Sequence, residues 1–178
     1  MTSVTKAELR RAALERRAAL PAAVRESLIA RAPIEGAVLA KTYRSRVAAA
    51  YWPIRGEADP LPILAELGAA GLTTALPVVA GRGMPLVFRQ WRPGDPLVAG
   101  PMGLKEPGAE SPATEPDLLF VPLAAFDRAG HRIGYGAGFY DATLAALALK
   151  RPLAVGLAFS TQEVAAVPAQ ATTIRSRL

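Results

Sequence analysis

The amino-acid sequence predicts a single α/β domain over residues 1–178, built as a three-layer α/β/α sandwich with a mostly parallel sheet. Short apolar segments alternate along the chain with segments of helical pattern. This alternation is typical of parallel sheets whose two faces are covered by helices. In addition, 51% of the 178 residues are hydrophobic, which is enough for one substantial core.

The N-terminal segment is expected to form a helix over residues 5–20. Thr5 followed by Glu8 makes a capping box, in which each side chain accepts from the other residue's backbone N–H, and a proline follows the segment. Lys6 and Arg10 are four residues apart, so they share one face of this helix.

Helices and strands alternate through the rest of the chain. Further helices are expected at residues 22–43, with an interruption near Pro33, and at 61–71 and 140–150. Short apolar strands are expected at residues 47–53, 73–79, 84–91, 117–122 and 153–159. Residues 92–116 are rich in proline and glycine and are expected to form a long loop, which in a compact domain more often serves a ligand site.

The composition excludes several kinds of catalytic site. The chain has no cysteine, which excludes disulfides, thiolate zinc sites and cysteine nucleophiles. It has one histidine, His131, which excludes paired-histidine metal motifs and argues against a histidine triad. Any metal is therefore expected to be a hard cation held by carboxylates, with Mg²⁺ as the first candidate.

The net charge of +6 allows two interpretations. The surplus can give a well-solvated surface, or it can serve an anionic partner such as a nucleotide, a nucleic acid or a polycarboxylate. No apolar run is long enough to span a membrane, and the charged N-terminal segment is unlike a signal peptide. We therefore expect a cytoplasmic protein with no membrane partner.

The stretch HRIGYGAGFYDATLA places Gly134, Gly136 and Gly138 directly before a predicted helix. Successive unencumbered amides can form an anion-binding nest, and the helix N-terminus adds partial positive charge, so phosphate is the expected guest. The spacing is not the dinucleotide fingerprint, which needs glycine or alanine where Phe139 stands, and it is not a P-loop. A plain glycine turn without a ligand is the alternative.

Two charged residues flank these glycines, and each has two interpretations. Asp141, in the first turn of the predicted helix, either complements the helix dipole or holds a Mg²⁺ ion that bridges phosphate oxygens. Arg132 is either a solvated loop residue or a cation that faces the same phosphate.

The run AFDRAGHRIGYGAGFYD resembles the pattern of the 5-formyltetrahydrofolate cyclo-ligase family. Other segments agree with that family in order and spacing, so the resemblance covers nearly the whole chain: KAELR, YWPIRGEADP, FRQWRPGDPLVAGPMGLKEP, DLLFVPLAAFD and VGLAFSTQEVAAVP. The resemblance implies the same α/β fold. It also implies the family's reaction, the ATP-dependent closure of 5-formyltetrahydrofolate to 5,10-methenyltetrahydrofolate with release of ADP and phosphate.

The resemblance also implies a set of site residues. Arg132 and Tyr140 would be catalytic, and Asp141 would hold Mg²⁺. Folate contacts would fall on Trp52, Glu57, Trp91 and Phe139. ATP contacts would fall on two segments, made of Lys6, Ala7, Glu8, Leu9 and Arg10, and of Arg132, Ile133, Gly134, Tyr135, Gly136, Ala137, Gly138, Phe139 and Tyr140.

The implied chemistry fits these residue types. ATP would phosphorylate the formyl oxygen, the N10 amine would attack the activated carbon, and phosphate would leave. Such a reaction needs positioning and charge neutralisation rather than a nucleophilic side chain. Glu57 suits the paired N–H groups of a pterin, although it would otherwise be a solvated glutamate. Trp52 and Trp91 are alternatively core aromatics.

Some positions depart from the family pattern. Ala137 stands where glycine or lysine is common, and Phe139 stands where tyrosine is usual. The C-terminal segment 169–178 is atypical, because Thr173 occupies the place of a second magnesium aspartate and threonine is a weaker ligand. A shifted reading frame is one hypothesis for this segment, and sequencing the encoding DNA tests it.

The leading expectation is a monomeric ligase that uses MgATP and 5-formyltetrahydrofolate and binds no nucleic acid. A second possibility is a catalytically impaired homologue that binds folate or nucleotide, its atypical C-terminal segment having cost the activity. A third is a nucleic-acid-binding protein that uses the basic N-terminal helix, although no RNA- or DNA-binding motif is present.

Overall fold

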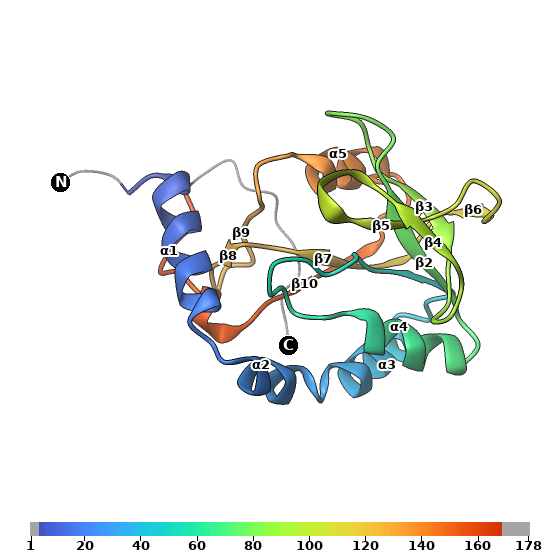
Figure 1. Ribbon diagram of the computed structural model, residues 1–178, viewed down its shortest axis with the longest axis horizontal. Helices are drawn as coiled ribbons and strands as arrows, with labels where there is room; N and C mark the ends of the chain where they lie inside the picture. Colours follow the sequence, from blue (N-terminus) through green and yellow to red (C-terminus); the bar gives the residue numbers. More distant parts are fainter. Residues whose placement is uncertain (1–3, 169–178) are drawn as a thin grey trace.

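The computed structural model describes residues 4–168, and a six-stranded sheet lies at its centre (Figure 1). The strands follow the order β10–β7–β1–β2–β3–β6 across the sheet, and the first four pair in parallel. They are β10 (Leu153–Leu157), β7 (Leu118–Pro122), β1 (Val47–Ala49) and β2 (Thr73–Val78). The predicted α/β class and mostly parallel sheet are confirmed.

Two antiparallel strands extend the sheet beyond β2. β3 (Val87–Gln90) pairs with β2, and β6 (Ala113–Thr114) pairs with β3. Burial alternates around β3, because Leu86 and Phe88 are buried while Val87 is 39% exposed. One face of this part of the sheet therefore packs on the core and the other meets solvent.

Helices cover both faces of the sheet, as the three-layer prediction requires. α3 (Ala32–Thr42) and α4 (Leu61–Ala69) lie side by side on one face, and α5 (Phe139–Ala146) lies on the other (Figure 1). The N-terminal ends of α3 and α4 are marked by prolines in their first turns. Proline is tolerated there because the backbone N–H that it lacks would have no intrahelical partner.

The central strand β7 shows how the sequence divides the two layers. Leu118 and Phe120 pack in the cluster that contains α3 and α4, whereas Leu119 and Val121 pack in the cluster that contains α5. All four side chains are fully buried, and each such burial contributes roughly 2 kcal/mol. An uninterrupted apolar run thus marks a strand covered on both faces.

α1 (Lys6–Ala18) begins with the predicted capping box. The Glu8 N–H donates to Thr5 Oγ1 at 3.3 Å, and the Thr5 N–H donates to Glu8 Oε2 at 2.7 Å. α2 (Ala22–Ile29) follows and is separated from α3 just before Pro33, so the predicted interruption is confirmed.

The expectation that residues 92–116 form a loop without secondary structure was wrong. They contain a hairpin of β4 (Leu97–Ala99) and β5 (Lys105–Pro107), joined by a 3₁₀ turn, and also β6. The hairpin is anchored by a buried carboxylate, because Glu106 Oε1 accepts from the Val79 N–H at 3.1 Å, just after β2. A second, unpredicted hairpin pairs β8 (Ala125–Phe126) with β9 (Arg132–Ile133).

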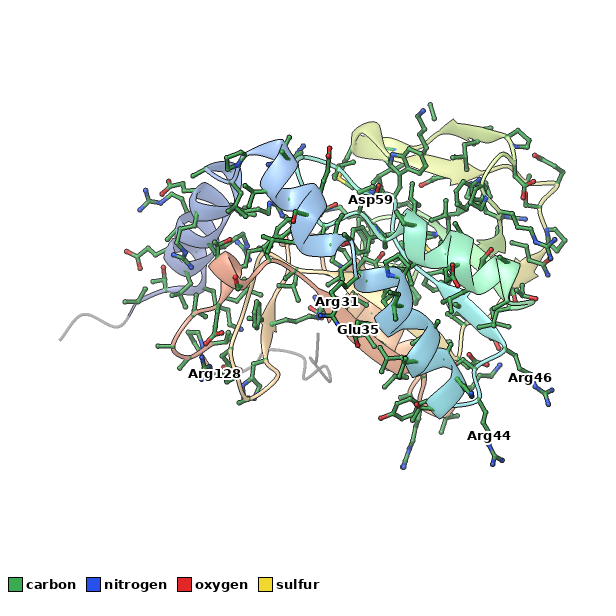
Figure 2. The ribbon with its side chains drawn as sticks, turned by 90° about the horizontal axis from the view of Figure 1, so that it is seen from below. Arg31, Glu35, Arg44, Arg46, Asp59 and Arg128 are labelled. Carbon is green, nitrogen blue, oxygen red and sulfur yellow. The ribbon has the colours of Figure 1, made fainter. Side chains whose placement is uncertain are left out.

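Much of the positive charge lies on separate parts of the surface. Figure 2 shows Arg44 and Arg46 near one end of the molecule and Arg128 near the other. Arg128 pairs with Glu163 at 2.6 Å, and the exposed Arg31 pairs with Glu35 along α3 at 3.8 Å. Within residues 4–168, no helix combines the length and the apolar character needed to cross a membrane.

Candidate active site

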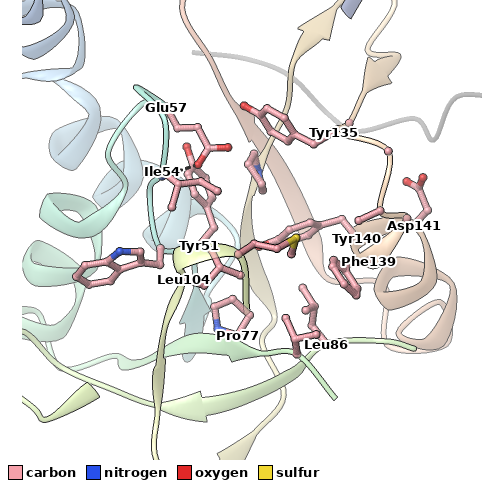
Figure 3. Close-up of a pocket in the computed structure, with 18 of the residues that line it drawn as sticks. Tyr51, Ile54, Glu57, Pro77, Leu86, Leu104, Tyr135, Phe139, Tyr140 and Asp141 are labelled. Carbon is pink, nitrogen blue, oxygen red and sulfur yellow. Dashed lines mark hydrogen bonds between the residues drawn. The ribbon is translucent and has the colours of Figure 1, made fainter. Parts of the chain in front are cut away.

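A cavity of about 370 Å³ opens between segments that are far apart in the sequence. Its walls come from α1, the residues that follow β1, the β4–β5 hairpin, and the loop of residues 134–138 that leads into α5 (Figure 3). We call this last segment the glycine loop. The long proline-rich segment therefore does border a cavity, because Met102, Leu104 and Lys105 line it.

The glycine loop needs glycine at two positions for conformational reasons. Gly136 has φ 101°, and Gly138, the N-cap of α5, has φ 73°. Side chains rarely adopt these angles, although a Cβ at Gly138 would meet no atom within 4 Å. At Gly134 space is tighter, since a Cβ would lie 3.1 Å from Arg132 Nη1. Glycine at positions 134, 136 and 138 therefore leaves these parts of the loop without side chains.

α1 is attached to the glycine loop by one of its predicted cations. The Arg10 Nε–H donates to the Gly134 carbonyl at 2.8 Å, and Lys6, one turn earlier, lines the same cavity. Three other residues of the predicted ATP segment, Ala7, Glu8 and Leu9, do not line it. Leu9 packs instead against the small cluster beneath α1.

Arg132 and Asp141 form an ion pair at the start of α5. The Arg132 side chain is 4% exposed and the Asp141 side chain is 57% exposed. Burial lowers the pKa of Arg132, and the nearby Asp141 carboxylate opposes that shift. Arg132 Nε is buried and has no hydrogen-bond partner among the described residues. This arginine therefore has a donor available for an anion in the cavity.

Tyr140 places a second unpartnered donor in the same cavity. Its hydroxyl is buried and makes no hydrogen bond within residues 4–168. Burial raises the pKa of this phenol, and the negative charge of Glu57 raises it further. The hydroxyl consequently keeps its proton at neutral pH. Buried polar atoms are usually satisfied, so this pair of donors, Arg132 Nε and Tyr140 OH, indicates a ligand that is an acceptor.

Glu57 lies across the cavity from α5, in a tight turn after β1 (Figure 3). Its Oε2 accepts from the Ile54 N–H at 2.9 Å, and its own N–H donates to the Ile54 carbonyl at 3.1 Å. Burial raises the pKa of the Glu57 carboxyl, while hydrogen bonds and the charges of Arg17 and Arg55 limit the rise. The turn thus fixes one carboxylate oxygen and aims the group into the cavity.

The two predicted tryptophans occupy different places. Trp52 lines the cavity, with Lys105 Nζ 5.3 Å from its ring centroid, whereas Trp91 is 5% exposed and does not line it. The Trp91 ring stands edge-on to Trp52, with centroids 6.5 Å apart and an interplanar angle of 87°. Trp91 therefore supports Trp52 from the core. Phe139, at the N-terminus of α5, does line the cavity.

A magnesium ion can be held here with the help of a nucleotide. No group of three or more acidic, histidine or cysteine side chains suited to a metal occurs within residues 4–168. Asp141 is one half-exposed carboxylate that lines the cavity just after the glycine loop. In nucleotide sites, Mg²⁺ is often held by one or two carboxylates together with phosphate oxygens and water. Thr173, the predicted place of a lost second ligand, lies outside the described residues.

Sequence reasoning missed some residues of the cavity. Tyr51 lines it, and its hydroxyl donates to the Ala58 carbonyl at 2.5 Å, which closes the segment that holds Glu57. Lys105 reaches the cavity from a hairpin that was expected to be a loop. No local pattern distinguishes either residue from an ordinary core tyrosine or surface lysine. They belong to the site only because the fold brings them to the cavity.

Taken together, these contacts define a class of site. At one end lie cations, a helix N-terminus and unpartnered donors suited to phosphate, and at the other lie a carboxylate and aromatic rings suited to a flat, hydrogen-bonding ligand. The sequence model of the 5-formyltetrahydrofolate cyclo-ligase family matches residues 2–174. The chain therefore belongs to that family of ligases, and the resemblance found in its motifs is confirmed.

Individual relatives agree with this membership. The chain is 38% identical over 152 residues to the 5-formyltetrahydrofolate cyclo-ligase of Mycolicibacterium smegmatis, a match that covers 81% of this chain and 77% of the relative. It is 35% identical over 123 residues to the enzyme of that name from Escherichia coli, a match that covers 65% of this chain and 66% of the relative.

Solved structures agree with the fold. The NMR structure of Aquifex aeolicus 5,10-methenyltetrahydrofolate synthetase superposes with a TM-score of 0.78 at 31% identity, covering 96% of this chain and 86% of that one. A 5,10-methenyltetrahydrofolate synthetase from Mycoplasma pneumoniae superposes with a TM-score of 0.75 at 21% identity, covering 97% of each chain. The second likeness supports the fold alone.

Proposed function

We propose that this protein catalyses the ATP-dependent cyclisation of 5-formyltetrahydrofolate to 5,10-methenyltetrahydrofolate, with release of ADP and phosphate. Family membership supports the reaction, and the two-ended cavity supports the pair of substrates. The observation that carries the proposal is that two residues with buried, unpartnered donors line the same cavity as Glu57, whose carboxyl has a raised pKa. These donors are Arg132 Nε and Tyr140 OH, which have no hydrogen-bond partner within the described chain.

The nucleotide lies at the glycine-loop end. The amides of the loop and the N-terminus of α5 bind phosphate oxygens, because they carry partial positive charge and have no side chains in front of them. Lys6 and Arg10 approach from α1 and neutralise the triphosphate. Arg132 and Tyr140 donate to the phosphoryl group that is transferred.

The folate lies at the other end, with its pterin beside Glu57. The carboxylate accepts from the amino and ring N–H groups of the pterin, which is the charge-assisted pairing that two coplanar oxygens allow. Trp52 and Phe139 pack against the flat rings. Trp91 acts indirectly in this arrangement, by holding the Trp52 ring edge-on from the core.

The reaction proceeds in two steps that this site can position. The formyl oxygen attacks the γ-phosphorus and ADP leaves, which converts the oxygen into a phosphate leaving group. The N10 lone pair then attacks the formyl carbon. N10 loses its proton, and the bond between that carbon and the phosphorylated oxygen breaks, which releases phosphate. Both steps build charge at oxygens near the glycine loop, where donors are fixed before the reaction begins.

Asp141 is the residue that would hold Mg²⁺ with the nucleotide, and the ion would neutralise charge on the β- and γ-phosphate oxygens. Asp141 pairs with Arg132 in the protein alone, so the arginine would share this carboxylate with the ion when a metal nucleotide is bound. Arg132 would donate to the phosphate oxygens of that nucleotide.

We further propose that the protein acts as a monomer without nucleic acid. The cavity is bordered on several sides by segments of a single chain, and two of the surface arginines pair with glutamates. Size-exclusion chromatography with light scattering tests the first statement. Binding to labelled oligonucleotides at several salt concentrations tests the second, since non-specific binding would be strongly salt-sensitive.

The experiment that tests the function follows the absorbance of methenyltetrahydrofolate after 5-formyltetrahydrofolate is mixed with protein, ATP and Mg²⁺. We expect formation that depends on both ATP and protein, with one ADP released per product. The Arg132→Met variant should lose this activity while remaining folded. Product formation that is equal with and without ATP, after subtraction of the protein-free blank, would refute the proposal.

A further inference from the structure

Arg17, near the end of α1, is a buried cation that no acidic side chain neutralises directly. It is 5% exposed, and it makes no salt bridge within residues 4–168. It also does not line the cavity. The charge of Arg17 lowers the pKa of the Glu57 carboxyl, but its direct contacts are hydrogen bonds. Burying a charge is costly, so these hydrogen bonds indicate what the residue is for.

Those hydrogen bonds join two walls of the cavity. Arg17 Nη1 bonds to the hydroxyl of Tyr135, in the glycine loop, and the guanidinium carbon lies 5.7 Å from the centroid of the same ring. Arg17 Nη2 donates to the Arg55 carbonyl at 2.9 Å. The rigid fork of one guanidinium therefore spans the phosphate end and the Glu57 end of the site.

The Arg55 carbonyl belongs to a turn that does not form easily. Arg55 has φ 51° and Gly56 has φ 74°, two consecutive left-handed residues, and this conformation is unfavourable for a residue with a Cβ. Glu57 follows directly, and its carboxylate position depends on the turn, because it accepts from the Ile54 N–H. The hydrogen bond from Arg17 to the Arg55 carbonyl thus stabilises the strained residue of the turn that aims Glu57.

We infer that Arg17 is a positioning residue that fixes the Glu57 turn relative to the glycine loop and thereby couples the binding of folate to the binding of nucleotide. This inference rests on the proposed function. α1 carries the device as a unit, since Arg10 and Arg17 are seven residues apart on one helical face and both contact the glycine loop. Neither contact requires Arg17 to touch a substrate.

Variants at position 17 and a matched control test the inference. Arg17→Met removes the charge and both bonds, Arg17→Lys keeps the charge but not the two-pronged geometry, and Tyr135→Phe removes one acceptor. Arg16→Met is the control, because Arg16 makes two side chain-to-backbone bonds from the same helix, to the Thr161 and Glu163 carbonyls, away from the cavity. Thermal unfolding of all four variants verifies that each is folded.

The main measurement is the affinity of a nonhydrolysable ATP analogue, titrated calorimetrically with and without saturating 5-formyltetrahydrofolate. In the unaltered protein the folate should raise nucleotide affinity by roughly tenfold, a usual size for coupled sites. In Arg17→Met, the ratio of nucleotide affinity with folate to that without folate should fall close to one. Arg17→Lys and Tyr135→Phe should give ratios between one and that of the unaltered protein, whereas Arg16→Met should keep the full ratio. An unaltered protein without coupling, or Arg17 variants that keep the full ratio, would overturn the inference.

A second readout is the pH dependence of folate affinity. The charged and titratable groups around Glu57 are Arg17, Arg55, Tyr135, Tyr51 and Tyr140. Of these, Tyr135 lowers the pKa of the Glu57 carboxyl through a hydrogen bond, and the two arginines lower it through their charge. Loss of Arg17 should therefore move the acid limb of folate binding to higher pH. If Arg17 had a merely structural role, the acid limb of folate binding in Arg17→Met would lie at the same pH as in Arg16→Met.

The outcomes also separate this inference from the function on which it rests. If the unaltered protein binds neither folate nor the ATP analogue, both statements fail. If it binds both ligands with coupling and Arg17→Met behaves like Arg16→Met, the enzyme assignment stands and Arg17 is an ordinary structural arginine.

Discussion

Two carboxylates line the cavity within the described chain, and their surroundings differ. Glu57 is partly buried and has a raised pKa, whereas the Asp141 side chain is 57% exposed and pairs with Arg132. A ring system with N–H donors suits the first group, and a hydrated cation suits the second. The difference in burial therefore assigns the two acids to different ligands, although both are simple carboxylates in the sequence.

Glu57→Gln should weaken folate binding and leave nucleotide binding nearly unchanged. The amide keeps the shape of the carboxylate but turns one acceptor into a donor that faces the pterin's donors, a mismatch worth roughly 1–3 kcal/mol. We expect the affinity for 5-formyltetrahydrofolate to fall by about one to two orders of magnitude, measured by calorimetry. Unchanged folate affinity would remove Glu57 from the binding site.

The same carboxyl should give folate binding an acid limb. Because burial raises the pKa of Glu57, protonation begins at a higher pH than for an exposed glutamate, and the protonated form loses an acceptor. The KM for folate should therefore rise as the pH falls through the raised pKa, and the limb should be missing in Glu57→Gln. An ATP-free blank at each pH subtracts any non-enzymatic ring closure.

Asp141→Asn should reduce ATP-dependent turnover and should also destabilise the free protein. A carboxylate in the exposed first turn of a helix usually contributes little to stability. The ion pair with the buried Arg132 changes that expectation, since its loss leaves a buried cation without this partner. Solvent exposure of Asp141 limits the cost to about 1 kcal/mol.

Urea unfolding of Asp141→Asn, with and without Mg²⁺ and an ATP analogue, measures both parts of this prediction. The isosteric change leaves the packing intact, so a loss of turnover cannot be attributed to a packing defect. A variant that keeps full turnover at limiting Mg²⁺ would contradict the metal role, and one with unaltered stability would show that the ion pair contributes nothing.

At the scale of elements, the glycine loop and α5 act as one unit. Thr143 Oγ1 donates to the Phe139 carbonyl at 2.6 Å and accepts from the Leu86 N–H at 2.9 Å, so the helix is fixed to the sheet beside the cavity. The position of the helix N-terminus then depends on the left-handed Gly138 that precedes it.

Gly138→Ala should weaken nucleotide binding more than its effect on stability explains. A Cβ at Gly138 has space but not a favourable φ, which costs roughly 1 kcal/mol or moves the loop. Gly83→Ala is the control, because Gly83 has φ 74° and equally open surroundings in a turn that does not line the cavity. Equal losses of stability with equal nucleotide affinity in the two variants would count against a phosphate-binding loop.

Elements with strong local signals could be predicted, and elements that depend on tertiary contacts could not. The capping box fixed the start of α1, and the fully apolar β7 revealed a strand covered on both faces. The β4–β5 hairpin has strands of only three residues, and β4 is largely exposed. The hairpin is anchored by Glu106, which accepts a hydrogen bond from the distant Val79 N–H. A contact of that kind leaves no periodicity in the sequence.

The site shows the same division. The glycines and Asp141 form a local pattern, so spacing and family resemblance were enough to select them. Tyr51 and Lys105 belong to the cavity through folding alone. Arg17 lies between these cases, because a spacing of seven residues puts it on the same face of α1 as Arg10, but its hydrogen-bond partners are in two distant loops.

For the whole molecule, ligand binding should appear as stability. A ligand that binds the folded state at a hundred times its Kd stabilises by about 2.7 kcal/mol, which for a chain of this size corresponds to a rise in Tm of roughly 5–10 °C. We expect such a rise with MgATP analogue, and a smaller one when EDTA removes the metal.

Asp141→Asn should keep the metal-independent part of this rise and lose the metal-dependent part. Scanning calorimetry of both proteins with analogue, with and without Mg²⁺, makes the comparison. If the variant responds to Mg²⁺ as strongly as the unaltered protein does, the ion is held by phosphate and by residues other than Asp141.

The order of strands in the sheet also sets the order in which the chain can assemble. β1 lies between β2 and β7, and β7 lies between β1 and β10, so the central strands wait for partners that are synthesised much later. Parallel pairings across such long separations form slowly, since the intervening chain must be closed first. A nascent chain that has emerged only as far as β3 therefore carries a strand with one unpaired edge and apolar residues that lack their final cover. During that interval the protein is most exposed to aggregation, so the yield of refolded protein should be highest in dilute solution.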